Sequence, residues 1–193
     1  LSWAIIALQL GLMRLLSVTR WHHFSYFVLS TALLGYGISG TILRRFGDDW
    51  CERYERLMFL ICSSTAVAVV VVVPLANLLP IDSQSLLRGA GQIGLFTLYN
   101  LMVLIPFLIG ATGIGLGLMK IDESASSLYG VSMLGTAVGG AGALGTIFLL
   151  DEMRVVLIAA PLSLLAAIPW LKSENGGWVR SRIAWFTAGL AAV

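Results

Sequence analysis

The sequence predicts an all-α fold, a polytopic transmembrane helix bundle. Of the 193 residues, 58% are hydrophobic and only 11% are charged, whereas a soluble domain is roughly 25% charged. The charged residues separate five long uncharged stretches, at 21–43, 57–81, 89–119, 124–150 and 155–171. Each is long enough for one span, because a helix needs about 17–25 apolar residues to cross the hydrocarbon core. Continuous runs such as 67–73, which contains only Val and Ala, lack the alternation typical of a membrane β-barrel.

The same composition excludes three other classes of protein. Disorder requires low hydrophobicity and a high net charge, which this chain does not have. The formal net charge of +2 is too small to indicate a nucleic-acid-binding protein. Cys51 and Cys62 are too few and too far apart in the sequence for a disulfide framework or a Cys-rich metal site.

We expect a single transmembrane helical domain of about six to seven spans. Their approximate positions are 1–19, 21–43, 57–80, 93–119, 125–150, 155–171 and 183–193. The first and last positions fall in apolar runs that reach the ends of the sequence, so we expect the chain to be truncated at both ends and to belong to a longer protein. Residues 44–56 form a polar connection of thirteen residues, for which we expect a short interfacial helix.

The distribution of Lys and Arg predicts the orientation. Eight of these residues fall in the connections after the second, fourth and sixth spans, and four fall on the opposite side. Since cytoplasmic loops carry an excess of Lys and Arg, we expect an integral membrane protein, in a bacterial inner membrane, with its N-terminus in the cytoplasm.

Residues 35–40 read GYGISG and match the pattern G-x-G-x-x-G. A dinucleotide site needs this turn between a strand and a helix, where free backbone N–H groups can meet a pyrophosphate. Here the glycines fall inside an apolar span, whose helix already uses those N–H groups. We therefore predict no cofactor-binding residue in the chain.

Small residues four positions apart predict close contacts between helices instead. In lipid, helix association depends on tight van der Waals packing, which small side chains permit. We expect the Gly-rich fourth and fifth spans to pack against each other or against a shared neighbour. We expect Val69, in a Val-rich run, to face lipid or to be loosely packed. The predicted helix-packing residues are Gly35, Ser39, Gly113, Gly117, Gly135 and Gly139.

Three residues form a candidate polar site in the membrane. Arg14 lies near the end of the first span, where it either forms a functional site at membrane depth or extends to the interface near Arg20. His22 and His23 follow Trp21 at the start of a span. Adjacent residues on a helix point about 100° apart, which disfavours a shared metal ion, and this pattern is also typical of an interfacial belt. We predict no catalytic and no metal-binding residue.

Two blocks of the sequence carry a resemblance to a known family. The second-helix motif of the large spermidine synthase-like integral membrane proteins resembles residues 21–41, WHHFSYFVLSTALLGYGISGT. That family's pairing of a Pro-Phe helix with a Tyr-x-x-x-x-Leu-Gly-Ala-x-x-Gly helix is similar to residues 105–110, IPFLIG, and 128–140, LYGVSMLGTAVGG. The resemblance covers most of the chain, from the first partial helix to the sixth span.

The resemblance implies a function as a membrane anchor. In that family a helical membrane region precedes a cytosolic Rossmann-like domain related to spermidine synthases and S-adenosylmethionine-dependent methyltransferases. The implied partners are the lipid bilayer and that domain, and the implied substrate is a membrane-borne lipidic or polyamine-type molecule. No catalytic residue is carried over, because the catalytic domain is not among these residues. The chain departs from the family pattern at Ser132, where we expect Asp, and at Thr136, where we expect Ala.

An alternative interpretation is half of a secondary transporter of the major facilitator type. Residues 40–47 read GTILRRFG, and the connection after the second helix of that fold is also rich in Gly and Arg. The predicted spans contain no Asp, Glu or Lys, which disfavours a proton-coupled carrier. The sequence after Val193 would distinguish the two interpretations. A strand, a Gly-rich turn and a helix would support the spermidine synthase-like interpretation, and six more spans would support the transporter.

Overall fold

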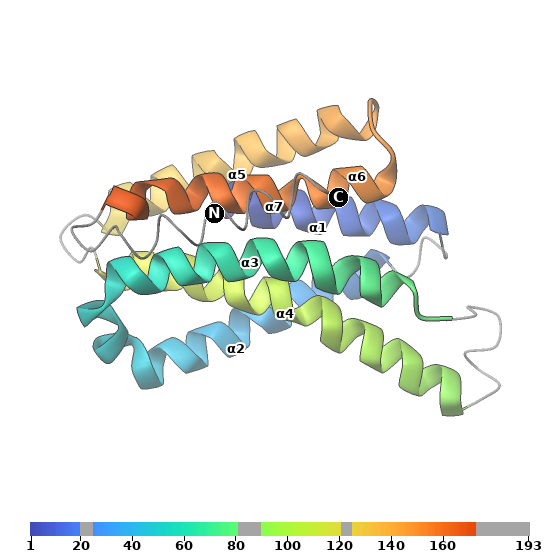
Figure 1. Cartoon of the computed structure of the whole chain (residues 1–193), viewed down its shortest axis with the longest axis horizontal. Helices are drawn as coiled ribbons and strands as arrows, with labels where there is room; N and C mark the ends of the chain where they lie inside the picture. Colours follow the sequence, from blue (N-terminus) through green and yellow to red (C-terminus); the bar gives the residue numbers. More distant parts are fainter. Residues whose placement is uncertain (20–24, 81–89, 121–124, 173–193) are drawn as a thin grey trace.

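The computed structural model of the chain describes residues 1–19, 25–80, 90–120 and 125–172 (Figure 1). Within these ranges the protein is all-helical and contains no strand. The elements are α1 (Ser2–Thr19), α2 (Ser25–Glu52), α3 (Tyr54–Asn77), α4 (Ala90–Lys120), α5 (Ala125–Ile147), α6 (Glu152–Leu157), α7 (Ala159–Ala167) and the 3₁₀ helix η2 (Ile168–Lys172).

Five helical segments are long and apolar enough to cross a membrane, in agreement with the predicted membrane class. They are Ser2–Thr19, Ser25–Glu52, Tyr54–Asn77, Gly91–Lys120 and Glu152–Trp170. The Gly-rich α5, at the position of the span expected over 125–150, is not among these five. The span expected at 183–193 and the start of the span expected at 21–43 lie outside the described residues.

The polar connection at residues 44–56 does not form a separate interfacial helix, so that expectation was wrong. α2 continues without a break to Glu52, and α3 begins at Tyr54. Only Arg53 between them departs from helical geometry, with φ −108° and ψ 28°. The charged segment contains no proline that would interrupt α2. α2 therefore extends about 12 Å beyond Arg44, at 1.5 Å per residue.

The long helices run up and down along the longest axis of the molecule (Figure 1). α4 packs against α2 and α3, α1 packs against α5 and α6, and α3 contacts α7. α2 and α4 run parallel to each other. Two bonds show this register, since Thr31 bonds to Asn100 and Lys120 bonds to Cys51, each pair 69 positions apart.

Two apolar clusters fill the interior. The larger includes buried residues of α1, α3, α4 and α6, among them Leu8, Leu12, Val69, Val103, Phe107 and Val156. The smaller lies where α2, α3, α4 and α7 meet, and includes Leu43, Met58, Phe59, Cys62, Leu116 and Ala167.

Val69 lies in the larger cluster and is 0% exposed, so the expectation that it faces lipid was wrong. Val71 is 54% exposed on the same helix. In a uniform run of Val and Ala, the position of the neighbouring helices decides which side chains are buried.

The last described span is interrupted between α6 and α7, at Ile158. Pro161 lies four residues after Leu157. Proline has no N–H to donate to the carbonyl of the residue four positions before it, and its ring crowds that carbonyl. The interruption therefore follows from Pro161.

Candidate functional site

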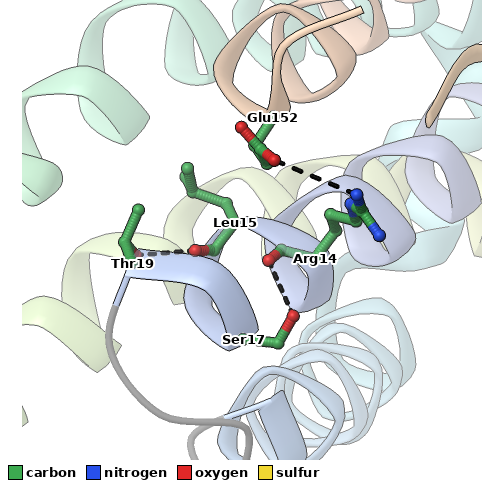
Figure 2. Close-up of polar contacts among 5 residues, drawn as sticks. All are labelled: Arg14, Leu15, Ser17, Thr19 and Glu152. Atoms are coloured by element: carbon green, nitrogen blue, oxygen red, sulfur yellow. Dashed lines mark hydrogen bonds and ion pairs between the residues drawn. The ribbon is translucent and has the colours of Figure 1, made fainter. Parts of the chain in front are cut away.

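Arg14, the candidate for a charged residue at membrane depth, forms an ion pair with Glu152 in the first turn of α6 (Figure 2). Arg14 Nη2 lies 4.0 Å from Glu152 Oε1, and the two side chains are 44% and 33% exposed. A pair with this separation and exposure contributes about 0–1 kcal/mol to stability. Arg20, toward which the alternative interpretation directed Arg14, lies outside the described residues.

The backbones of α1 and α6 approach each other closely beside this ion pair. A Cβ atom at Gly11 would lie 3.1 Å from both the N and the Cα atoms of Val156. Gly11 and Arg14 are three residues apart on α1, and Glu152 and Val156 are four apart on α6, so each pair shares one helix face. α1 and α6 can therefore approach at Gly11 and bring Arg14 beside Glu152.

Neither Gly11 nor Glu152 was among the predicted site residues. Gly11 follows Ala7 by four positions, so the small-residue spacing used for the other glycines could have identified it. The partner of Arg14 could not be identified in this way, because it is 138 positions away in the sequence.

Two side-chain hydroxyls near the C-terminal end of α1 form hydrogen bonds with backbone carbonyls of the same helix (Figure 2). Ser17 Oγ donates a hydrogen bond of 2.9 Å to the carbonyl of Arg14, and Thr19 Oγ1 donates one of 2.6 Å to that of Leu15. Both are local bonds within α1, of the kind in which a Ser or Thr hydroxyl bonds to the carbonyl three or four residues earlier in its own helix.

His22 and His23, the other members of the predicted polar site, lie outside the described residues. In the part of the chain that the structure describes, no group of three or more His, Cys, Asp or Glu side chains could hold a metal ion.

Gly35 and Ser39 lie on the face of α2 that packs against α4. A Cβ atom at Gly35 would lie 3.1 Å from Phe107 Cβ and 3.2 Å from the backbone N of Leu108. Ser39 is buried, and its hydroxyl donates to the carbonyl of Tyr36 at 2.8 Å. α2 can therefore approach the α4 backbone closely at Gly35.

Gly113 and Gly117 lie on α4 toward the start of α3. A Cβ atom at Gly113 would lie 2.7 Å from Ile61 Cγ2 and 2.7 Å from Leu1 Cδ2. At Gly117 the nearest atom, the Tyr54 hydroxyl oxygen, would be 3.6 Å away, an ordinary contact distance. Gly113 is thus the more constrained of the two.

Gly139 and Gly135 face α1. A Cβ atom at Gly139 would lie 2.7 Å from Ile6 Cγ2 and 2.9 Å from Trp3 Cα, whereas one at Gly135 would lie 3.9 Å from Ser2 Cβ. The first turns of α1 thus lie against the Gly-rich face of α5. Ile5 of the same segment lies against Gly110 of α4, so α1 is a shared neighbour of the two Gly-rich helices.

Two polar contacts join helices within the apolar segments. The hydroxyls of Ser2 and Ser132 are hydrogen-bonded at 2.7 Å between α1 and α5, at the position where the family resemblance led us to expect Asp. Thr31 Oγ1 donates to Asn100 Oδ1 at 3.1 Å, between α2 and α4. Both bonds connect helices that also approach each other at a glycine.

The contacts between the helices thus comprise an ion pair, interhelical hydroxyl bonds and close glycine contacts, which are the means by which helices associate in lipid.

Comparison of the chain with protein-family models, with curated proteins and with solved structures yields no match.

Proposed function

We propose that this chain is the membrane-embedded region of a spermidine synthase-like protein, which anchors a cytosolic domain of the S-adenosylmethionine-binding Rossmann type. The contact between the two blocks that carry the resemblance supports the proposal most directly. Gly35, from residues 21–41, lies against Phe107 and Leu108, from residues 105–110. Residues that pack one helix closely against another are what a structural membrane region requires.

The buried polar groups also suit an anchor. Thr65, Thr112 and Ser163 are buried, and each hydroxyl donates to the carbonyl four residues earlier in its own helix, at 2.7–2.8 Å. Their hydrogens are already used inside the helices that carry them. Such groups contribute to packing and offer no free donor to a solute passing between the helices.

We further propose that the bundle lies in a bacterial inner membrane, with its arginine-rich end in the cytoplasm. The helices run up and down, and α2 ends where α3 begins and where Lys120 of α4 bonds to Cys51. The cations of two connections therefore gather at one end of the bundle. Among the described residues they are Arg44, Arg45, Arg53, Arg56 and Lys120.

The test begins with the coding sequence after the codon for Val193. A strand, a Gly-rich turn and a helix with an acidic residue would support the proposal. The protein expressed from the whole gene should then bind S-adenosylmethionine with one-to-one stoichiometry in calorimetry, whereas residues 1–193 alone should not.

Six further spans in that coding sequence would overturn the proposal and favour the transporter alternative. Stoichiometric binding of the nucleoside by residues 1–193 alone would also overturn it, because the anchor would then contain the binding site.

A further inference from the structure

The innermost charges at the arginine-rich end are cations. On α2, Arg44 and Arg45 directly follow the uncharged segment Ser25–Leu43, and on α3, Arg56 directly precedes the uncharged segment Leu57–Asn77. The carboxylates of α2 lie farther from the apolar segment, at Asp48, Asp49 and Glu52. At 1.5 Å per residue, this separates them from Arg44 by about 6–12 Å along the helix.

The arginines of the two helices lie at a similar depth. Leu43 contacts Gly115 of α4, and Ile61 contacts Gly113, two residues away. Arg44 directly follows Leu43, and the α3 arginine lies five residues, about 7 Å, before Ile61 toward the same end. The α2 and α3 arginines are therefore within about one helical turn of the same level.

The two ends of the bundle differ in the counter-ions of their cations. At the end where α1 stops, Arg14 pairs with Glu152 at 4.0 Å, and Arg154 Nε lies 3.6 Å from Asp151 Oδ2. At the other end, no ion pair with a carboxylate of the described residues is formed by the three innermost arginines, Arg44, Arg45 and Arg56. These guanidinium groups are exposed and can therefore bind anions from outside the described residues.

Aromatic side chains mark this level as the membrane interface. Phe46 and Trp50 stack with ring centroids 6.0 Å apart and an interplanar angle of 17°, and Tyr54 meets Trp170 edge to face at 5.0 Å. Trp and Tyr are enriched where the hydrocarbon meets the headgroups. The arginines thus lie at the level where we expect the lipid phosphates.

We propose that Arg44, Arg45 and Arg56 bind the phosphate groups of anionic phospholipids such as phosphatidylglycerol. A guanidinium group matches phosphate oxygens with two parallel hydrogen bonds. The phosphate of a zwitterionic lipid is already compensated by the cation of its own headgroup, so these arginines should select lipids with a net negative charge. Asp48 and Asp49 follow the α2 arginines by four residues, the less favourable order for an ion pair on a helix.

The test reconstitutes the chain in nanodiscs of phosphatidylcholine with a minor fraction of phosphatidylglycerol, and counts the retained lipids by native mass spectrometry. The unmodified chain should retain phosphatidylglycerol preferentially. Since each basic residue at a membrane surface strengthens the attraction about fivefold, R44Q/R45Q should lower this preference by roughly 25-fold. The matched control R14Q/R154Q removes the same charge from the end whose cations are paired, and should change the preference by less than about twofold.

Three results would overturn the proposal. One is an equal loss of preference in R44Q/R45Q and R14Q/R154Q, which would mean that only net charge matters. Another is an unmodified chain that does not distinguish the two lipids. The third is displacement of the retained lipid by an equal concentration of soluble glycerol phosphate, which would indicate a site for soluble anions. Since all four arginines are exposed, the variants should fold, and equal melting temperatures would establish this.

Discussion

Gly139 and Gly140 are neighbours on α5 with different surroundings. At Gly139 a Cβ atom would lie 2.9 Å from Trp3 Cα, whereas at Gly140 nothing lies within 4 Å. The atom near Gly139 belongs to the α1 backbone and cannot rotate away as a side chain can. A larger residue at Gly139 must therefore push the two helices apart.

We predict that Gly139→Leu lowers the thermal stability of the chain in detergent, by about 1–3 kcal/mol, the usual cost of overpacking. Lipid or detergent gives no hydrophobic compensation for the lost helix contact. Gly140→Leu is the matched control, because it makes the same change in helix propensity on the open side of α5. Equal melting temperatures for the two variants would show that α5 does not pack through Gly139.

The geometry of the α1–α6 contact depends on a glycine more than on its charges. A Cβ atom at Gly11 would meet backbone atoms of Val156 at 3.1 Å, whereas Arg14 and Glu152 are partly exposed and 4.0 Å apart. We predict that Gly11→Leu destabilises the chain by about 1–3 kcal/mol. Arg14→Gln should cost less than about 1 kcal/mol. Thermal unfolding of both variants measures which substitution costs more stability. A larger loss of stability for Arg14→Gln would reverse our interpretation of the contact.

At the scale of the elements, α2 and α4 form a parallel pair with two kinds of contact. Gly35 allows the close approach. Thr31 donates to Asn100 Oδ1, and Asn100 Nδ2 donates to the carbonyl of Phe96 at 2.8 Å. The second bond orients the Asn100 side-chain amide so that its Oδ1 can accept the hydrogen bond from Thr31. The pair is thus joined at a small residue and at one polar bond about one turn away.

We predict a small coupling between Thr31 and Asn100. In a double-mutant cycle of Thr31→Val and Asn100→Leu, the interaction should be about 0.6 kcal/mol and at most about 1.7 kcal/mol, the range for hydrogen bonds between membrane helices. Thr97→Val with Asn100→Leu is the control, because Thr97 is exposed and bonds to Ile93 of its own helix. An equal coupling in both cycles would mean that the Thr31 bond does not join the helices.

The existence of helices followed from the sequence, but their faces followed only in part. The spacing of small residues identified Gly35 and Ser39 as one packing face. In the structure Gly35 meets α4, whereas at Gly37 and Gly40 nothing lies within 4 Å of a Cβ atom. By contrast, nothing in the run of Val residues distinguished the buried Val69 from the exposed Val71. These differences depend on the rotation of each helix, which its neighbours fix.

The end of α2 shows a different limit. Charge alone suggested that the membrane helix ends at Leu43, because Arg44 and Arg45 mark the limit of the apolar segment. Backbone hydrogen bonding does not require apolar side chains, so α2 continues to Glu52. The limits of a membrane span and the limits of a helix are therefore separate quantities, and only the first could be inferred from charge.

At the scale of the whole molecule, the described helices run up and down between the same two ends of the bundle. The side of the membrane on which one end lies therefore fixes the orientation of all of them. Cys51, in the last turn of α2, lies at the arginine-rich end and is partly exposed. Cys62 is buried in the smaller apolar cluster and 0% exposed. The chain has no other cysteine. The two thiols should therefore differ in their access to a reagent in water.

We predict that a membrane-impermeant maleimide labels Cys51 only after cells that express the chain are permeabilised. The excess of Lys and Arg at this end indicates the cytoplasmic side, where the reagent cannot reach an intact cell's thiols. Cys51→Ser should abolish the labelling, because the remaining thiol of Cys62 is buried. Cys62→Ala should leave it unchanged. Labelling of Cys51 in intact cells would invert the proposed orientation, and a domain attached at the arginine-rich end would then lie outside the cytoplasm, away from S-adenosylmethionine.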